Sequence, residues 1–315
     1  MSHFSLSVII FAESRRTCLV LDFANSPLLT FKSTGNIPHR GHVTDTQYKP
    51  NITAAFEGDW GDDNTTLWPC IRLVGEEPSK RQSTKQQRKQ AMSYLHCLLL
   101  ARPDLHVAQG LLTTKKRIMF LFGIGGHGIR SFSVHWDDDD VYKLMYAFVY
   151  RLYDPGHFGD PSYLSMVPNL HENLVTYTIR ITVDDQDKKS NSIDCSGFSP
   201  IYASRPFGSR THILSNPRSE IKVGGKVMRV IKDQLCQPGT RFDEHNILTH
   251  IHSPAKVPGV VEAVYHESID IPPLLGVSGE KCRMGLRQLG SPITSVCLKG
   301  MLEMVFDVLE GNLVS

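Results

Sequence analysis

Two ionisable side chains in the second half of the sequence are spaced to form a phosphate-binding pair. Lys232 lies in the segment VMRVIKDQL, where we expect it to end a β-strand, and Glu244 lies in RFDEHNIL, which favours a helix. Apolar residues follow Glu244 at i+3, i+4 and i+7, namely Ile247, Leu248 and Ile251. We therefore expect the carboxylate to face inward, where it needs a cationic partner. A lysine held in this way binds the α- and β-phosphates of a nucleotide.

Each residue also has a purely structural interpretation. Lysines often end edge strands, where they discourage aggregation, and a glutamate in a first helical turn favours the helix dipole. The order of the surrounding elements favours the functional interpretation. Three predicted strands (FSPIYAS, RTHILS and KVMRVIKDQL) precede a helix at about 239–252, and two strands (VVEAVYHESI and KCRMGLRQL) follow it. This is the order of a protein-kinase small lobe, with Lys232 in the place of the lysine of V-A-I-K.

The first half of the sequence predicts a separate α/β unit. Apolar residues at helical spacing predict a helix over about 91–99 that Pro103 ends, and a second helix over 141–152 that begins after four aspartates. Three segments between these helices, VAQGLL, RIMFLFGI and IRSFSVHW, and the later segment 174–183 have the pattern of strands. We expect a small sheet beside these helices.

The predicted fold class is therefore α+β: an N-terminal α/β domain followed by a kinase-like small lobe made of an antiparallel sheet with one helix. The predicted divisions are a poorly defined or partly disordered segment at 1–66, an N-terminal domain at 67–195, a small-lobe-like region at 196–296, and the first helix of a large lobe at 297–315. About five strands are expected between 197 and 296. We expect the rest of a kinase large lobe to be missing.

Six segments resemble the fungal-type protein kinases of mushroom-forming fungi, in family order and over residues from about 67 to 310. They are QAMSYLHCLLLARPDLHVAQGLL, GIGGHGI, YKLMYAFVYRLYDPGHFGDPSYLS, RPFGSRTHILSNP, VIKDQLCQPGTRFDEHNILTHIHSPAKVPGVVEAVYHE and GLRQLGSPITSV. The resemblance implies serine/threonine phosphorylation as the family's activity, and Lys232 and Glu244 as the nucleotide lysine and its helix partner. It also implies that a turn near Arg205, Phe207, Gly208 and Ser209 covers the phosphates, although this turn departs from G-x-G-x-x-G.

The sequence departs from the family at the residues that perform catalysis. A kinase needs the Asp and Asn of H-R-D-x-x-x-x-N and the Asp of D-F-G, and none of these motifs follows Glu244. The similar triplets at 39–41 and 22–24 precede Lys232, so their order is wrong. Without these groups neither the nucleophile nor Mg²⁺ is positioned. We expect weak ATP binding, no Mg²⁺ site, no catalytic residue and no phosphoryl transfer by this chain.

Two other motifs are interpreted structurally. Gly123, Gly125 and Gly128 satisfy G-x-G-x-x-G, but a predicted strand follows them where a dinucleotide fold needs a helix, so a hairpin turn is favoured. The basic stretch at 80–89 has no interleaved aromatic residues for base stacking, so a solvated helix face is favoured over nucleic-acid binding.

The composition limits the classes of partner and the cellular compartment. The 315-residue chain has 34 basic and 32 acidic residues, which gives no field for a polyanionic partner. Its seven scattered cysteines fit neither a disulfide framework nor a zinc site, so we expect an intracellular, cytoplasmic or nuclear protein. No apolar run approaches the ~20 residues of a membrane span.

Two functions remain open from the sequence. One is an inactive or truncated kinase with weak nucleotide binding. The other is a non-catalytic protein-interaction module, in which a protein partner or a second copy contacts the apolar stripe of the predicted helix at 298–309.

Overall fold

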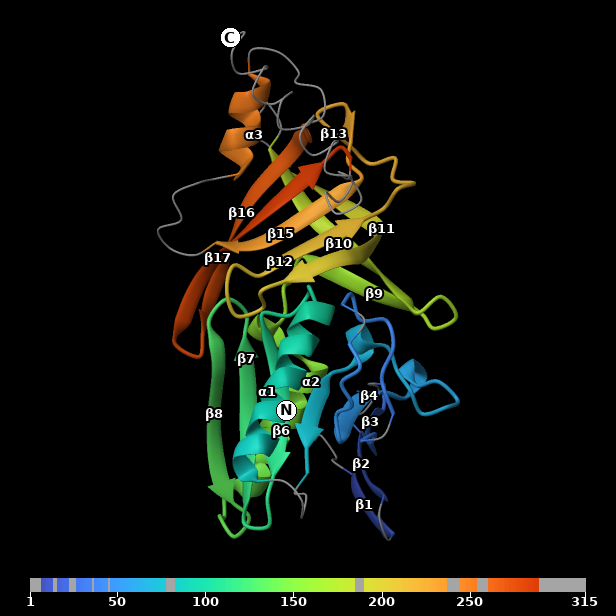
Figure 1. Ribbon diagram of the computed structural model, residues 1–315, viewed down its shortest axis with the longest axis vertical. Helices are drawn as coiled ribbons and strands as arrows, with labels where there is room; N and C mark the ends of the chain where they lie inside the picture. The colour runs from blue at the N-terminus through green and yellow to red at the C-terminus, as the bar shows by residue number, and fades with distance from the viewer. Residues whose placement is uncertain are drawn as a thin grey trace, which may run out of the picture.

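The computed structural model describes residues 7–13, 16–22, 27–35, 37–44, 46–77, 83–184, 190–236, 244–253 and 260–288. Two large β-sheets lie end to end along the long axis of the molecule (Figure 1). The protein is thus a mixed α+β structure in which sheet predominates. No helix within the described ranges is long and apolar enough to cross a membrane.

The first sheet contains eight strands whose spatial order follows the sequence. They are β1 (Ser7–Glu13), β2 (Arg16–Asp22), β3 (Leu29–Ser33), β4 (Ile52–Phe56), β5 (Leu73–Glu76), β6 (Val107–Thr113), β7 (Arg117–Ile124) and β8 (Gly128–His135). All neighbours pair antiparallel except β5 and β6, which are parallel and are joined through α1 (Thr84–Ala101). Short 3₁₀ helices, η1 (Glu57–Asp59) and η2 (Trp68–Cys70), precede β5.

Helices α1 and α2 (Val141–Tyr153) cover opposite faces of this sheet. Side chains alternate along a strand, so Val74, Ala108 and Leu121 face α1, whereas their neighbours Leu73 and Val107 belong to the core beneath α2. The Ser83 hydroxyl begins α1 by accepting from the Gln86 amide at 3.3 Å, which satisfies one of the free amides of the first turn. Both predicted helices and strands β6, β7 and β8 are confirmed.

The N-terminal segment differs from the expectation of a poorly defined region at 1–66. Strands β3 and β4 pair with each other inside the first sheet, and β4 also pairs with β5. Leu29, Ala54 and Ala55 are fully buried there. Long polar loops flank these two short strands. The polar composition of the loops dominates this part of the sequence, so the pattern of two buried strands is not recognisable in it.

The second sheet contains seven strands in the order β16-β17-β15-β12-β11-β10-β9. They are β9 (Tyr163–Asn169), β10 (Leu174–Asp184), β11 (Ser190–Ser204), β12 (Thr211–Ser215), β15 (Val230–Cys236), β16 (Ala263–Leu274) and β17 (Val277–Leu286). The remaining elements of this half are η3 (Gly156–Phe158), the hairpin of β13 (Lys222–Val223) and β14 (Lys226–Val227), and α3 (Glu244–His252).

The five strands expected between 197 and 296 are present, and they are part of this larger antiparallel sheet. The sheet also takes in β9 and β10, and β11 runs without interruption across the expected boundary between residues 195 and 196. The second unit therefore begins near Tyr163. Strands β10 and β11 pair antiparallel from Tyr177 and Phe198 to Asp184 and Ser190, so both belong to the same sheet.

Helix α3 lies at the end of the second sheet farthest from the first sheet (Figure 1). Leu248 is buried against Val230 and Leu286, but Ile247 is 42% exposed. Ile251 is half-buried. Of the three apolar residues expected on the inward face of this helix, Leu248 alone is buried. The predicted helix at 298–309 lies outside the described residues.

Arg210, which immediately precedes β12, joins the two sheets. It is buried and donates to three carbonyl oxygens, those of Leu99, Arg102 and Leu105, around the end of α1. His212 also contacts the carbonyl oxygen of Leu100, at 3.1 Å. The final carbonyls of a helix have no partner within the helix, so these side chains of the second sheet complete the C-terminus of α1.

Four charged side chains form a buried charge cluster beside this junction: Asp160, Asp233, Lys281 and Arg283. Arg283 donates to both carboxylate oxygens of Asp233 at 2.7 Å, and Lys281 contacts both aspartates. Burial by itself would raise the pKa of Asp233, but Arg283 and Lys281 outweigh it and lower that pKa. The cluster contains two positive and two negative side chains, so the buried charges are balanced.

Candidate functional site

Strand β15 carries Lys232 between β12 and β17, which pair with it on either side. Because side chains alternate along a strand, Lys232, Gln234 and Cys236 share one face and Asp233 lies on the other. The Asp233 face holds the buried charge cluster. The Lys232 face borders a pocket that opens beside α3.

The expected ion pair between Lys232 and Glu244 is confirmed: the Lys232 Nζ donates to Glu244 Oε2. Glu244 is the first residue of α3, where a carboxylate also favours the helix dipole. The Lys232 side chain is 18% exposed and that of Glu244 is 44% exposed. The pair is therefore within reach of solvent and of a ligand.

The pocket around this pair has a volume of about 440 Å³. This lies within the range of roughly 300–1,000 Å³ typical of small-molecule sites. Its other lining residues come from β15, α3, β16, β17 and the turn before β12: Ser209, Gln234, Leu235, Cys236, His245, Ile247, His266, Ser268, Glu280, Cys282 and Met284. Two glutamates and one lysine line it, so the pocket lacks the excess of positive charge that would favour a polyphosphate.

Two stacked imidazole rings form the wall of the pocket between α3 and β16. The rings of His245 and His266 have centroids 4.4 Å apart and planes inclined by only 8°. They offer flat aromatic surface next to the lysine. Among the described residues, no group of three or more His, Cys, Asp or Glu side chains is arranged to hold a metal ion.

A disulfide between Cys236 and Cys282 lies in the same pocket. In the antiparallel pairing of β15 with β17, Cys282 lies opposite Gln234, so Cys236 is its diagonal neighbour with the Cα atoms 6.4 Å apart. This distance is within the usual disulfide range. The sequence indicated no disulfide framework and did not predict this pair, because the two cysteines are 46 residues apart and come together only when the strands are in register. Cys70, Cys97 and Cys195 are free and buried.

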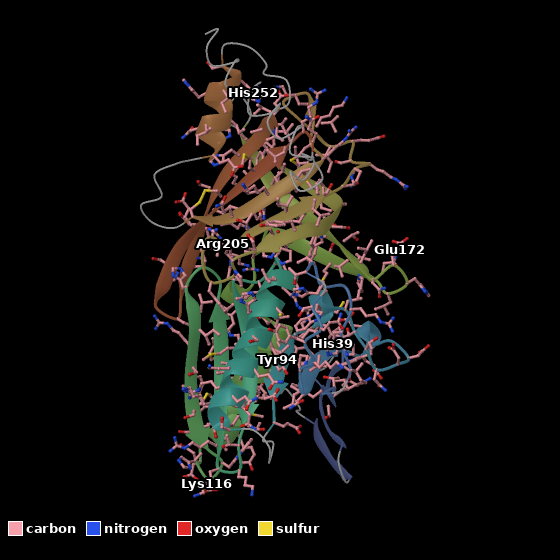
Figure 2. The ribbon with its side chains drawn as sticks, in the orientation of Figure 1. His39, Tyr94, Lys116, Glu172, Arg205 and His252 are labelled. Atoms are coloured by element: carbon pink, nitrogen blue, oxygen red, sulfur yellow. A yellow bond between two sulfur atoms is a disulfide. The ribbon has the colours of Figure 1, made fainter. Side chains whose placement is uncertain are left out.

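The turn expected to cover the phosphates lies elsewhere. Phe207 packs against α1, with its ring centroid 5.7 Å from that of His96, and neither Phe207 nor Gly208 lines the pocket. The Gly126 amide donates to the carbonyl oxygen of Pro206 at 2.8 Å, which binds this turn to the first sheet. Figure 2 shows Arg205, the first residue of the turn, where the two sheets meet. The turn contributes only Ser209 to the pocket.

The glycine motif of the first half forms the hairpin turn between β7 and β8, as expected. Gly126 has a φ of +79°, and a Cβ at that position would lie 3.2 Å from Leu235 Cδ1 and 3.4 Å from the Gly208 carbonyl oxygen. A glycine is required because the backbones of the two turns approach closely. His127 is exposed. Gly126 therefore serves the contact between the two sheets.

No protein-family model, curated protein or solved structure matches this chain. The resemblance to fungal-type protein kinases therefore stays a prediction drawn from the residues.

Sequence reasoning missed the buried charge cluster and the disulfide. A signal for the cluster was present, because Lys281 and Arg283 alternate within one strand and so share a face. Asp233 directly follows Lys232 and so lies on the opposite face of β15 from the one predicted to bind phosphate. Nothing in the sequence gives the register that brings Cys236 to Cys282.

Proposed function

We propose that the pocket between α3 and the second sheet is a weak nucleotide-binding site in which Lys232 contacts the phosphates. The observation that carries this proposal is the ion pair between Lys232 and Glu244 on the wall of a pocket of about 440 Å³. The carboxylate holds the ammonium in place while leaving its other N–H groups to donate. The order of strands and helix around the pair supports a kinase-like small lobe.

Weak binding follows from the charges and from the displaced turn. Glu244 and Glu280 together outnumber Lys232 in the pocket, so a triphosphate meets net negative charge there. The Phe207–Gly208 turn is packed against α1 and does not supply amide groups above Lys232. We propose nucleotide binding without phosphoryl transfer by this chain, in the manner of an inactive member of the fungal-type kinase family.

Titration with a fluorescent ATP analogue, with and without Mg²⁺, tests this function. Lys232→Met should weaken binding about tenfold or more, because removal of a charged hydrogen bond of ~1.5–3 kcal/mol changes affinity by at least that factor. Lys222→Met is the matched control, since Lys222 is exposed on β13 and does not line the pocket. Equal binding by the two variants would exclude Lys232 as a phosphate ligand.

The absence of transfer is tested with radiolabelled ATP and a generic protein substrate. We expect no Mg²⁺-dependent labelling of the chain or of the substrate. Labelling that Lys232→Met abolishes would show that the chain is an active kinase.

A second candidate is a protein-interaction module, which the surface of α2 favours. Tyr142, Tyr146 and Tyr150 recur every four residues along this helix and are 80%, 42% and 40% exposed. Exposed aromatic residues are enriched at protein interfaces. Sedimentation velocity of the natural chain and of Tyr142→Ser tests self-association through this face. A concentration-dependent larger species that the substitution removes would favour this candidate.

A further inference from the structure

A second pocket lies in the first sheet, where β5 ends beside α1. It has a volume of about 460 Å³ and is lined by Gly35, Gln47, Tyr48, Lys49, Asn51, Glu76, Gln90 and Tyr94. Figure 2 shows Tyr94 on α1, in the half of the molecule that contains the first sheet. The pocket is at the carboxyl end of a strand that pairs in parallel with β6. The carboxyl ends of such strands are frequent ligand sites in α/β structures.

The carboxylate of Glu76 is the unusual feature of this pocket. The residue is 1% exposed, and its Oε1 accepts from Asn51 Nδ2 at 2.7 Å. Its Oε2 has no hydrogen-bond partner among the described residues, and no described cation forms an ion pair with it. A buried carboxylate oxygen without a donor has lost its hydrogen bonds to water and has gained none in return, which destabilises the fold. A ligand that donates to Oε2 and carries positive charge would remove this destabilisation.

Aromatic side chains adjoin the carboxylate. The rings of Tyr48 and Tyr94 have centroids 6.1 Å apart at an interplanar angle of 76°. The Tyr94 hydroxyl donates to the Lys49 carbonyl oxygen at 2.9 Å and accepts from Gln90 Nε2 at 2.6 Å. Its proton is thereby directed to the Lys49 carbonyl oxygen. The tyrosine is held in one position beside an unsatisfied acceptor.

We propose that this pocket binds a primary alkylammonium group, carried either by a free alkylamine or by a lysine side chain of another protein. Three N–H donors suit the free oxygen of Glu76, and the tyrosine rings attract a cation through their π-systems. A neutral hydroxyl would satisfy the oxygen but would not offset the negative charge of the ionised carboxylate. The expected ligand is therefore a cation.

The titration of Glu76 gives the site a pH dependence. Burial raises the pKa of Glu76 to about 7; the Tyr94 hydroxyl and Asn51 lower this pKa and the neighbouring Glu77 raises it. The other charged or titratable residues that line the pocket are Tyr48 and Lys49. An alkylammonium with a pKa of ~10.4 stays charged between pH 6 and pH 8, so its affinity should rise about tenfold as Glu76 ionises.

Calorimetric titration of the full chain with n-butylamine tests the site, with n-butanol as a neutral ligand of similar size. We expect binding of the amine but not of the alcohol, and a loss of at least tenfold in Glu76→Gln. Glu77→Gln is the matched control, because it removes the same charge from the adjacent, exposed residue. Lys49→Ala should bind no more weakly than the natural chain, since it removes a positive charge that competes with the ligand.

Several results would overturn the proposal. One is that the natural chain fails to bind the amine, and another is that it binds the amine and the alcohol equally well. A third is that Glu76→Gln and Glu77→Gln lose the same amount of affinity for the amine. If Glu76→Gln fails to fold, the pH profile of the natural chain decides, and a flat profile between pH 6 and pH 8 rejects the site. Nα-acetyl-lysine-N-methylamide distinguishes the two sources of the ammonium group. If this analogue binds more tightly than n-butylamine, the natural ligand is a protein lysine; if it binds more weakly, the natural ligand is a free amine.

Discussion

Replacing Asp233 with Asn removes one charge from the buried charge cluster while keeping the size of the side chain. Lys281 and Arg283 are then left with Asp160 as the one carboxylate of the cluster, at 3.5 Å from Arg283. Removing one partner of a buried pair costs about 3–5 kcal/mol because a charge stays uncompensated. At roughly 2–4 °C per kcal/mol, the melting midpoint should fall by roughly 6–20 °C.

Thermal and urea unfolding followed by circular dichroism provides the assay. The matched control is Asp194→Asn, because Asp194 pairs with Arg180 on the surface, where both side chains are 49% exposed. This control should leave the midpoint unchanged. The double variant Asp233→Asn with Lys281→Met restores charge balance and should recover part of the loss. A midpoint for Asp233→Asn equal to that of the control would refute the role assigned to the cluster.

The pH dependence of this effect has a definite sign. Arg283 and Lys281 hold the pKa of Asp233 below its unfolded value of ~3.9, despite burial. The ionised carboxylate therefore stabilises the fold fully above about pH 4, and this contribution is lost as pH falls through the folded pKa. The difference in unfolding free energy between the natural chain and Asp233→Asn should be the same at pH 7 and pH 5. A difference that shrinks by pH 5 would contradict a lowered pKa.

Two further substitutions test the contact between the sheets. Arg210→Met leaves the carbonyls around the end of α1 without their donor, so it should cost at least about 1.5–3 kcal/mol and speed hydrogen exchange in the last turn of α1; unchanged exchange there would count against the capping role. Gly126→Ala places a Cβ at a left-handed position facing the Gly208 carbonyl and should cost about 1–2 kcal/mol or more in urea unfolding. Gly58→Ala, where an added Cβ would meet nothing within 4 Å, is its control.

The sequence predicts the elements whose apolar period is long and regular. Helix α2 and strand β7 carry sustained patterns, and both match the structure closely. Strand β9 does not, because most of its side chains are exposed or half-buried and it alternates weakly. Strands β3 and β4 were missed because only five residues each interrupt long polar loops.

The candidate site was predictable only in part, for a related reason. The Lys232–Glu244 pair followed from the order of elements, because a strand lysine and an inward helix carboxylate can meet without knowledge of the register. Glu76 could not be identified in the same way, since in the segment GEEPSK a buried carboxylate looks like one more surface charge. Its burial depends on α1 folding back over the end of β5.

The dependence of α1 on Arg210 constrains how the chain folds during synthesis. The helix and every strand of the first sheet leave the ribosome before residue 210, yet the carbonyls at the end of the helix receive their donor only from that residue. Domains generally fold as units, the N-terminal one first. Here the first unit can assemble its core early but must keep the last turn of α1 frayed or hydrated until β12 arrives. Chaperones and proteases would meet that open helix end in the interval.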